Sequence, residues 1–180
     1  MRLQPLQPEK TTGRTRELLD KVRAKMGAVP NIFKVMANAP AALDAYLAFS
    51  GAVATSTLPP PLREKIALAV AEVNRCDYCL AAHQAIGKRT GLSDHDVVES
   101  RRGKAADPKE EAALKLALEL VNTKGLPSEG VLSSARKAGL SDEEMLEVTA
   151  VTVLNIYTNY INHVGGTEVD FPKAEQLSGK

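Results

Sequence analysis

The only two cysteines of the chain lie in one short segment, Cys76-Asp77-Tyr78-Cys79, and a histidine, His83, follows four residues later. Two side chains three residues apart on the first turn of a helix lie on the same face. This spacing fits the separation of roughly 5–6 Å between Cα atoms that a disulfide tolerates. The ring of His83, at position i+4 from Cys79, can lie beside the second sulfur. The segment therefore combines two thiols and a base, which indicates a thiol–disulfide redox site.

A carboxylate further upstream, Glu64, is a candidate partner for His83. Along one straight helix Glu64 would lie about 18 Å from Cys76, since a helix rises roughly 1.5 Å per residue. If the chain instead reverses near Asn74-Arg75, Glu64 and His83 differ in height by only about 4–5 Å in an antiparallel helix pair. We therefore expect the Glu64 carboxylate to orient the His83 imidazole.

The chemistry of thiols explains why such neighbours are useful. The thiolate is the reactive species, and a free cysteine with a pKa of about 8.5 is mostly protonated at neutral pH. A helix N-terminus favours the thiolate through its dipole and its unpaired N–H groups. A nearby histidine can take the proton, and a carboxylate behind the ring increases its basicity. Glu64, His83 and Cys79 are predicted to form this relay, and Cys76 to close the disulfide.

Composition and apolar periodicity predict that these residues sit in an all-α domain. Apolar residues make up 44% of the chain and aromatic residues 4%. Ala and Leu, both strong helix formers, supply much of the apolar fraction. No segment alternates apolar and polar residues as a half-buried strand would. Helical spacing predicts helices over 12–26, 31–36, 43–53, 62–74, 76–90, 108–124 and 142–164.

A repeated boundary signal predicts further helix ends. Gly91-Leu92-Ser93-Asp94 and Gly139-Leu140-Ser141-Asp142 each place Gly-Leu before a serine, with an acidic residue three positions after the serine. This is the pattern of a capping box, which begins a helix. The prediction is one all-α, single-domain helical bundle of seven to nine helices over residues 11–172. An extended arm is expected over 1–10 and a polar tail over 173–180.

Charge and hydropathy exclude several classes of partner. Lys and Arg number 23 and Asp and Glu number 22, so no strong field is available to bind nucleic acid or an anionic membrane. No apolar run approaches the roughly 20 residues of a membrane span, and the N-terminus lacks the apolar core of a signal peptide. We expect a cytoplasmic protein, in which structural disulfides are rare and a C-x-x-C segment is catalytic or metal-binding.

The combined pattern Glu-x11-Cys-x2-Cys-x3-His, from Glu64 through Cys76 and Cys79 to His83, resembles the signature of the AhpD-like alkylhydroperoxidases. These proteins belong to the carboxymuconolactone decarboxylase superfamily. The ending of the chain before its tail is similar to that of the "peroxidase-related" branch. The similarity covers roughly residues 25–172. The segments that carry it, besides the signature, are Val29-Pro30-Asn31-Ile32-Phe33, Arg63-Glu64-Lys65-Ile66-Ala67-Leu68, Cys79-Leu80-Ala81-Ala82-His83 and Thr167-Glu168-Val169-Asp170-Phe171-Pro172.

The resemblance implies an AhpD-like helical fold, assembly as a homo-oligomer, and reduction of peroxides by a dithiol. It implies that Cys79 attacks the peroxide, that Cys76 resolves the sulfenic acid, and that Glu64 and His83 relay protons. The expected partners are a peroxide substrate and a protein or small-thiol reductant. No cofactor is expected beyond the redox-active Cys76–Cys79 disulfide, and no metal.

One residue departs from the family pattern. The best-known members carry a second histidine between the two cysteines, where this chain has Tyr78. Tyrosine, with an ordinary pKa near 10, is a poor base at neutral pH, so a simpler relay or a weaker peroxidase activity is expected here. A pocket for a bulky organic hydroperoxide is expected at the apolar faces around Ile66, Val70 and Leu80.

Three alternatives to a peroxidase remain at this point. A lyase like carboxymuconolactone decarboxylase is one, although decarboxylation has no use for a resolving thiol. A non-enzymatic redox sensor, in which the disulfide switches assembly, is another. A zinc site would take Cys76, Cys79 and His83 with Glu64 or Asp77, but the chain has no second Cys/His pair of the kind that structural zinc sites use.

A polar group on the last predicted helix has a structural interpretation. It is interpreted as an oligomer contact or a core hydrogen-bond network, in preference to a catalytic group. Its members are Asn155, Tyr157, Asn159, Tyr160 and His163.

Overall fold

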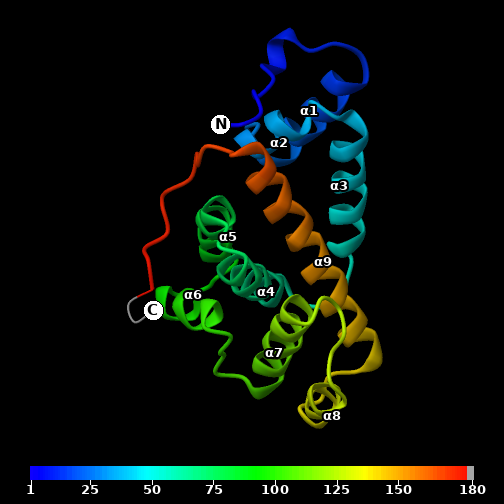
Figure 1. Cartoon of the computed structure of the whole chain (residues 1–180), viewed down its shortest axis with the longest axis vertical. Helices are drawn as coiled ribbons and strands as arrows, with labels where there is room; N and C mark the ends of the chain where they lie inside the picture. Colours follow the sequence, from blue (N-terminus) through cyan, green and yellow to red (C-terminus); the bar gives the residue numbers. More distant parts are fainter. Residues whose placement is uncertain (178–180) are drawn as a thin grey trace.

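The computed structural model describes residues 1–177, and within them the chain forms nine α-helices, one short 3-10 helix and no strand. The all-α, single-domain prediction of seven to nine helices is confirmed. The helices, arranged as in Figure 1, are η1 (Pro8–Lys10), α1 (Gly13–Met26), α2 (Asn31–Met36), α3 (Pro40–Val53), α4 (Pro60–Val73), α5 (Asp77–Arg89), α6 (Asp94–Arg101), α7 (Pro108–Asn122), α8 (Glu129–Lys137) and α9 (Asp142–Gly165).

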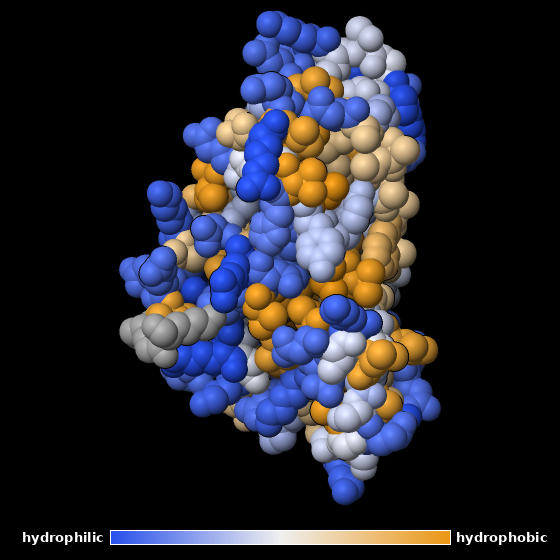
Figure 2. Space-filling model, in the orientation of Figure 1, coloured by the Kyte–Doolittle hydropathy of each residue, from blue (hydrophilic) through white to orange (hydrophobic). Residues whose placement is uncertain are grey.

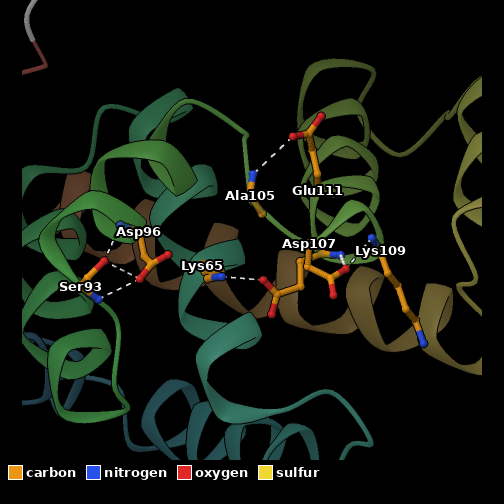
Figure 3. A network of polar contacts seen from close by, with 8 residues as sticks. Lys65, Ser93, Asp96, Ala105, Asp107, Lys109 and Glu111 are labelled. Carbon is orange, nitrogen blue, oxygen red and sulfur yellow. Dashed lines mark hydrogen bonds and ion pairs between the residues drawn. The ribbon is translucent and has the colours of Figure 1, made fainter.

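Helix α4 is the central element of the bundle. It contacts α5, α6, α7 and α9, and its residues from Lys65 to Ala71 are all buried. The helix is apolar nearly all round, which is typical of a helix enclosed by others. Within the buried stretch the charged residue is Lys65, whose ammonium group forms an ion pair with Glu110 of α7 at 2.5 Å (Figure 3).

The apolar core has two parts, and α4 supplies residues to both. Leu68 and Ala71 pack into the part formed with α1, α2 and α5, which also contains Cys76 and Cys79. Ile66, Ala69 and Val70 pack into the part formed with α7 and α9. Because the cysteines belong to the first part, their position depends on the packing of α4.

The chain reverses between α4 and α5 at the predicted place. Asn74 ends α4, Arg75 adopts a left-handed conformation with φ of 54°, and the N–H of Cys76 donates to the carbonyl of Ala71 at 2.9 Å. The bond from Arg75 N to the carbonyl of Glu72 completes a Schellman motif. A left-handed conformation costs a residue other than glycine roughly 1–2 kcal/mol. The motif places Cys76 directly at the N-cap of α5.

Both predicted capping boxes are present. Ser93 and Asp96 form the box at the start of α6, and Ser141 and Glu144 form the one at the start of α9. Figure 3 shows the first of them, and also the N-terminus of α7, where the Asp107 side chain accepts from the N–H groups of Lys109 and Glu110.

Predicted and observed helices differ most at three helices. Helix α3 begins at Pro40, three residues before the predicted start, since its first turn holds small alanines and gives no apolar stripe. The periodicity gives no range for α6 or α8, although the two capping signals imply a helix after Ser93 and one before Gly139. In residues 1–177 no helix has both the length and the apolar character of a membrane span.

The two chain ends pack against the bundle. The N–H groups of Arg2 and Leu3 donate to the carbonyl of Gly165 at the end of α9, and the predicted extended arm includes the 3-10 turn of η1. The segment after α9 runs past α5 towards α6 (red in Figure 1), where its Glu175 carbonyl accepts from Arg101 at 2.8 Å. Of the predicted tail, residues 178–180 lie outside the described part of the chain.

Candidate active site

The two thiols lie at the N-terminus of α5 and are almost fully buried. Cys76 is the N-cap residue, and its Sγ accepts the backbone N–H of Cys79 at 3.4 Å. The exposed fractions of the two residues are 1% for Cys76 and 2% for Cys79, and neither is in a disulfide. The side chain of Cys79 is in turn hydrogen-bonded to the sulfur of Cys76. The pair is therefore a reduced dithiol placed at a helix N-terminus.

Glu64 and His83 meet across the α4–α5 pair, as the reversal at Asn74-Arg75 predicted. His83 Nδ1 lies 2.8 Å from Glu64 Oε2, and the two side chains are 21% and 17% exposed. Burial lowers the pKa of His83, but the charge and hydrogen bond of Glu64, with a contribution from Cys76, raise the pKa more, so that it lies above its ordinary value. The carboxylate therefore favours the protonated imidazole.

The hydrogen bonds around the thiols distribute their charge unequally. The pKa of the Cys76 thiol is lowered most by the hydrogen bond from the Cys79 side chain. The Cys79 N–H, the Asn162 amide and the charge of His83 lower this pKa further, and together they outweigh the effect of burial, which raises it. Burial, followed by the influence of Cys76, raises the pKa of Cys79 well above its ordinary range. In the reduced pair the negative charge is therefore favoured on Cys76. The attacking role that the family resemblance implies for Cys79 stays a prediction.

Asn162 of α9 is a site residue that the sequence analysis missed. Its Nδ2 lies 3.2 Å from Cys79 Sγ and 3.9 Å from Cys76 Sγ, so the amide bonds directly to the pair. Asn159, one turn earlier, accepts from Asn74 at 2.8 Å, which confirms a core hydrogen-bond network for part of the group on this helix. The spacing of Asn155, Asn159 and Asn162, at i, i+4 and i+7, is the signal that places all three on one face.

Tyr78 is turned away from the relay and binds the C-terminal segment. Its hydroxyl donates to Asp170 Oδ1 at 2.7 Å and accepts the N–H of Ile32 at 3.3 Å. Its ring packs edge-to-face on Phe171, with ring centroids 5.7 Å apart. Burial, then the hydrogen bond to Asp170, raises the pKa of Tyr78 far above its ordinary value. The hydroxyl therefore does not replace the base that the family carries between its cysteines.

Removing the Tyr78 hydroxyl is expected to destabilise the protein. In a Tyr78→Phe variant the Asp170 carboxylate loses its donor and the Ile32 N–H loses its acceptor, which lowers the free energy of unfolding by about 1–2 kcal/mol. Urea denaturation measures the change. Tyr160→Phe is the matched control, since that side chain is 58% exposed and its hydroxyl has no hydrogen bond among residues 1–177. Equal losses in both variants would contradict the structural role.

The charge distribution predicts how the Cys76 thiol titrates. A hydroxyl at position 79 can still donate to Cys76 and favour its thiolate, whereas alanine cannot. We expect the pKa of Cys76 to be higher in Cys79→Ala than in Cys79→Ser, so that thiolate forms at higher pH. Ultraviolet thiolate absorbance against pH measures this, because Cys76 is then the only thiol. The same midpoint in both variants would show that the side chain at 79 does not bond to the sulfur.

A cavity of about 380 Å³ opens beside the relay. Glu64 and His83 belong to its lining, together with Phe33 and Tyr46. The pocket predicted around Ile66, Val70 and Leu80 was wrong: Ile66 and Val70 are completely buried in the core, because α4 is enclosed on all sides. The remaining residue of that prediction, Leu80, lines a separate hollow beside the C-terminal segment.

No metal-ligand cluster is found in the described part of the chain, where no three His, Cys, Asp or Glu side chains come together in a suitable arrangement. The Nδ1 atom of His83 is bonded to Glu64.

Comparison with a model of the carboxymuconolactone decarboxylase family gives a match over residues 40–119, a range that includes Glu64, both cysteines and His83. No curated protein sequence matches the chain.

Solved structures share the fold over almost the whole chain. A peroxidase-related protein with an alkylhydroperoxidase AhpD core, from Ralstonia eutropha JMP134, is 25% identical with a TM-score of 0.81, covering 94% of this chain and 92% of its own. A peroxidase-related protein from Silicibacter sp. TM1040 is 24% identical with a TM-score of 0.75, covering 93% and 88%. The debrominase Bmp8 is 20% identical with a TM-score of 0.77, covering 92% and 90%. The last two likenesses concern the fold alone.

Proposed function

Because the chain belongs to the AhpD-like carboxymuconolactone decarboxylase superfamily, we propose that it is a dithiol-dependent peroxidase that reduces peroxides with Cys76 and Cys79. The observation that carries the proposal is the contact of 2.8 Å between Glu64 and His83 next to two reduced, hydrogen-bonded thiols. A nucleophile, a resolving thiol and an oriented acid–base group are the parts that this reaction needs. A lyase would use no second thiol.

The first half of the reaction oxidises Cys79. The hydrogen bond between the two side chains is the route by which the Cys79 proton passes to Cys76, leaving a Cys79 thiolate that the Asn162 amide stabilises. This thiolate attacks one peroxide oxygen, so that an S–O bond forms and the O–O bond breaks. The leaving alkoxide takes a proton from the His83 imidazolium and departs as the alcohol. Cys79 is then a sulfenic acid.

The second half closes the disulfide. Neutral His83 takes the proton of Cys76, and the Cys76 thiolate attacks the sulfur of Cys79. The S–S bond forms, the S–O bond breaks, and the hydroxide takes the proton from His83 and leaves as water. One peroxide and two thiols thus give one alcohol, one water and one disulfide. A protein or small-thiol reductant returns two electrons and two protons for the next cycle.

Thiol counting tests the proposal. Reduced protein is titrated with an organic hydroperoxide, and the variants Cys76→Ser and Cys79→Ser are treated in parallel with a reagent that traps sulfenic acids. We expect both thiols to disappear for each peroxide consumed, and the trapped sulfenic acid to be on Cys79 in Cys76→Ser. Thiols that survive excess peroxide would overturn the proposal. A sulfenic acid trapped only on Cys76 would reverse the roles of the two cysteines.

Turnover separates an enzyme from a redox sensor. A peroxidase consumes peroxide repeatedly when a dithiol reductant is present, whereas a sensor remains oxidised after one equivalent. The measurement is peroxide consumption with excess dithiothreitol.

Assembly as a homo-oligomer is also proposed. Helix α9 exposes a row of apolar side chains at positions 146, 153, 160 and 164, which are 49–72% exposed. Figure 2 shows that apolar patches interrupt the charged surface on the face drawn there. A second copy covering this row would remove it from water.

A further inference from the structure

The cavity beside Glu64 and His83 is larger than hydrogen peroxide requires. Its volume is about 380 Å³, whereas a water molecule takes roughly 30 Å³ of liquid water. Cavities that bind small organic molecules begin at roughly 300 Å³. Much of the lining is apolar, and it includes Phe33, Leu47 and Leu154. These walls suit the hydrocarbon part of an organic hydroperoxide.

The charged residues of the lining are predominantly basic. They are Lys25 near the end of α1, Arg63 in the first turn of α4 and Arg89 at the end of α5. Among residues 1–177, Glu64 is the only acidic residue of the lining, and it is hydrogen-bonded to His83. The cavity thus carries a positive charge that the relay does not neutralise.

Two of these cations are available to a ligand. Lys25 and Arg89 are exposed, and neither forms an ion pair with any residue between 1 and 177. Arg63 is partly engaged, since its Nη1 donates to the Leu58 carbonyl at 2.8 Å and to Ser56 Oγ at 3.3 Å. Because Lys25 and Arg89 are exposed and the Glu64–His83 pair is mostly buried, the cations lie at the rim and the relay lies further inside.

We propose that the preferred substrate is an organic hydroperoxide that carries a carboxylate, bound with its O–O group at Glu64 and His83 and its carboxylate at Lys25 and Arg89. This inference rests on the proposed peroxidase function and names the substrate class of the same site. The apolar walls hold the hydrocarbon between the two polar ends. Basic residues at helix C-termini also complement the helix dipole, but Lys25 and Arg89 in addition line the cavity.

The test compares an ω-hydroperoxy fatty acid of medium chain length with its methyl ester, which has the same hydrocarbon and peroxide but no charge. We expect kcat/KM to be higher for the acid than for the ester. An exposed ion pair is worth up to about 1 kcal/mol, so each cation contributes up to roughly five-fold. The preference is expected to decrease as salt screens the rim charges. Equal values for acid and ester would overturn the inference.

Variants at the rim assign the preference to the cavity. In the double variant Lys25→Gln/Arg89→Gln the acid-to-ester ratio is expected to fall towards one. The control is Lys21→Gln/Lys88→Gln, which removes two positive charges from the same two helices outside the cavity lining. Lys88, unlike Arg89, is paired with Asp94, so unfolding of this double variant is measured in parallel. A ratio that falls equally in both double variants would contradict the proposal, since it would reflect net charge alone.

A binding measurement separates this inference from the peroxidase proposal. Calorimetry with the corresponding ω-hydroxy acid and its methyl ester needs no reaction at the thiols. The inference is supported if the acid binds more tightly than the ester and this preference is weaker in Lys25→Gln/Arg89→Gln. If the acid binds in this way but no peroxide oxidises the thiols, only the peroxidase function is overturned. Rapid thiol oxidation by peroxides with equal binding of acid and ester supports the function and overturns the inference.

Discussion

Replacing Glu64 with glutamine is expected to slow peroxide-driven oxidation of the thiol pair by about 10²–10⁴-fold, the usual contribution of a positioned acid–base group. The carboxylate is what raises the pKa of His83 against the opposing effect of burial. Without it, the pKa falls, the neutral imidazole is favoured, and the leaving alkoxide loses its proton donor. Single-turnover kinetics of thiol loss with an organic hydroperoxide, across pH, measure the effect.

The sign of the pH effect follows from the same contact. A histidine whose pKa is raised in the folded protein stabilises the fold below pH about 6.5, and this stabilisation is lost as the pH rises through the raised value. In Glu64→Gln, where burial lowers the pKa of His83, this contribution to stability should be lost or reversed in sign. The variant Glu64→Asp, which keeps the charge, serves as the comparison. Oxidation rates for Glu64→Gln within about three-fold of the parent would show that the relay does not limit the reaction.

Replacing Leu68 with alanine is expected to lower the free energy of unfolding by about 2–5 kcal/mol. Leu68 is 0% exposed and belongs to the part of the core that also contains the cysteines. The substitution removes buried methyl groups and leaves a cavity that the surrounding helices only partly fill. Chemical denaturation measures the loss as a lower midpoint.

The same substitution at an exposed site controls for the loss of a leucine side chain that leaves no cavity. Leu126, between α7 and α8, is 79% exposed, and Leu126→Ala is expected to change the free energy of unfolding by less than about 0.5 kcal/mol. A loss below 1 kcal/mol in Leu68→Ala would mean that the two core parts around α4 repack easily. This would contradict the central role of that helix.

Local signals predicted the elements and the contact between Glu64 and His83. Helix geometry and the reversal near Arg75 are sufficient to bring these two side chains to the same height, and the two serines of the capping boxes begin α6 and α9 where expected. Each of these features depends on residues close together in sequence. Periodicity and helical rise are reliable over such distances.

Contacts between distant segments were not predictable in the same way. The bond of Asn162 to the thiols joins residues more than 80 positions apart, and so does the bond between Tyr78 and Asp170. The cavity is also assembled from several helices, so its lining depends on how they pack. The unequal charge of the two cysteines depends on hydrogen-bond geometry, which the C-x-x-C spacing alone does not contain.

The hydrogen bonds to the Cys76 sulfur have a consequence for the reduction potential of the pair. The Cys79 N–H and the Asn162 amide favour the thiolate, a species that exists only in the reduced protein. Interactions that stabilise the reduced form make the disulfide more oxidising, by about 30 mV for each 1.4 kcal/mol. In the proposed reaction cycle, the groups that make the dithiol reactive therefore also make the disulfide easier for a partner thiol to reduce. Weakening them is expected to slow the proposed attack on peroxide and to make the oxidised form harder to reduce.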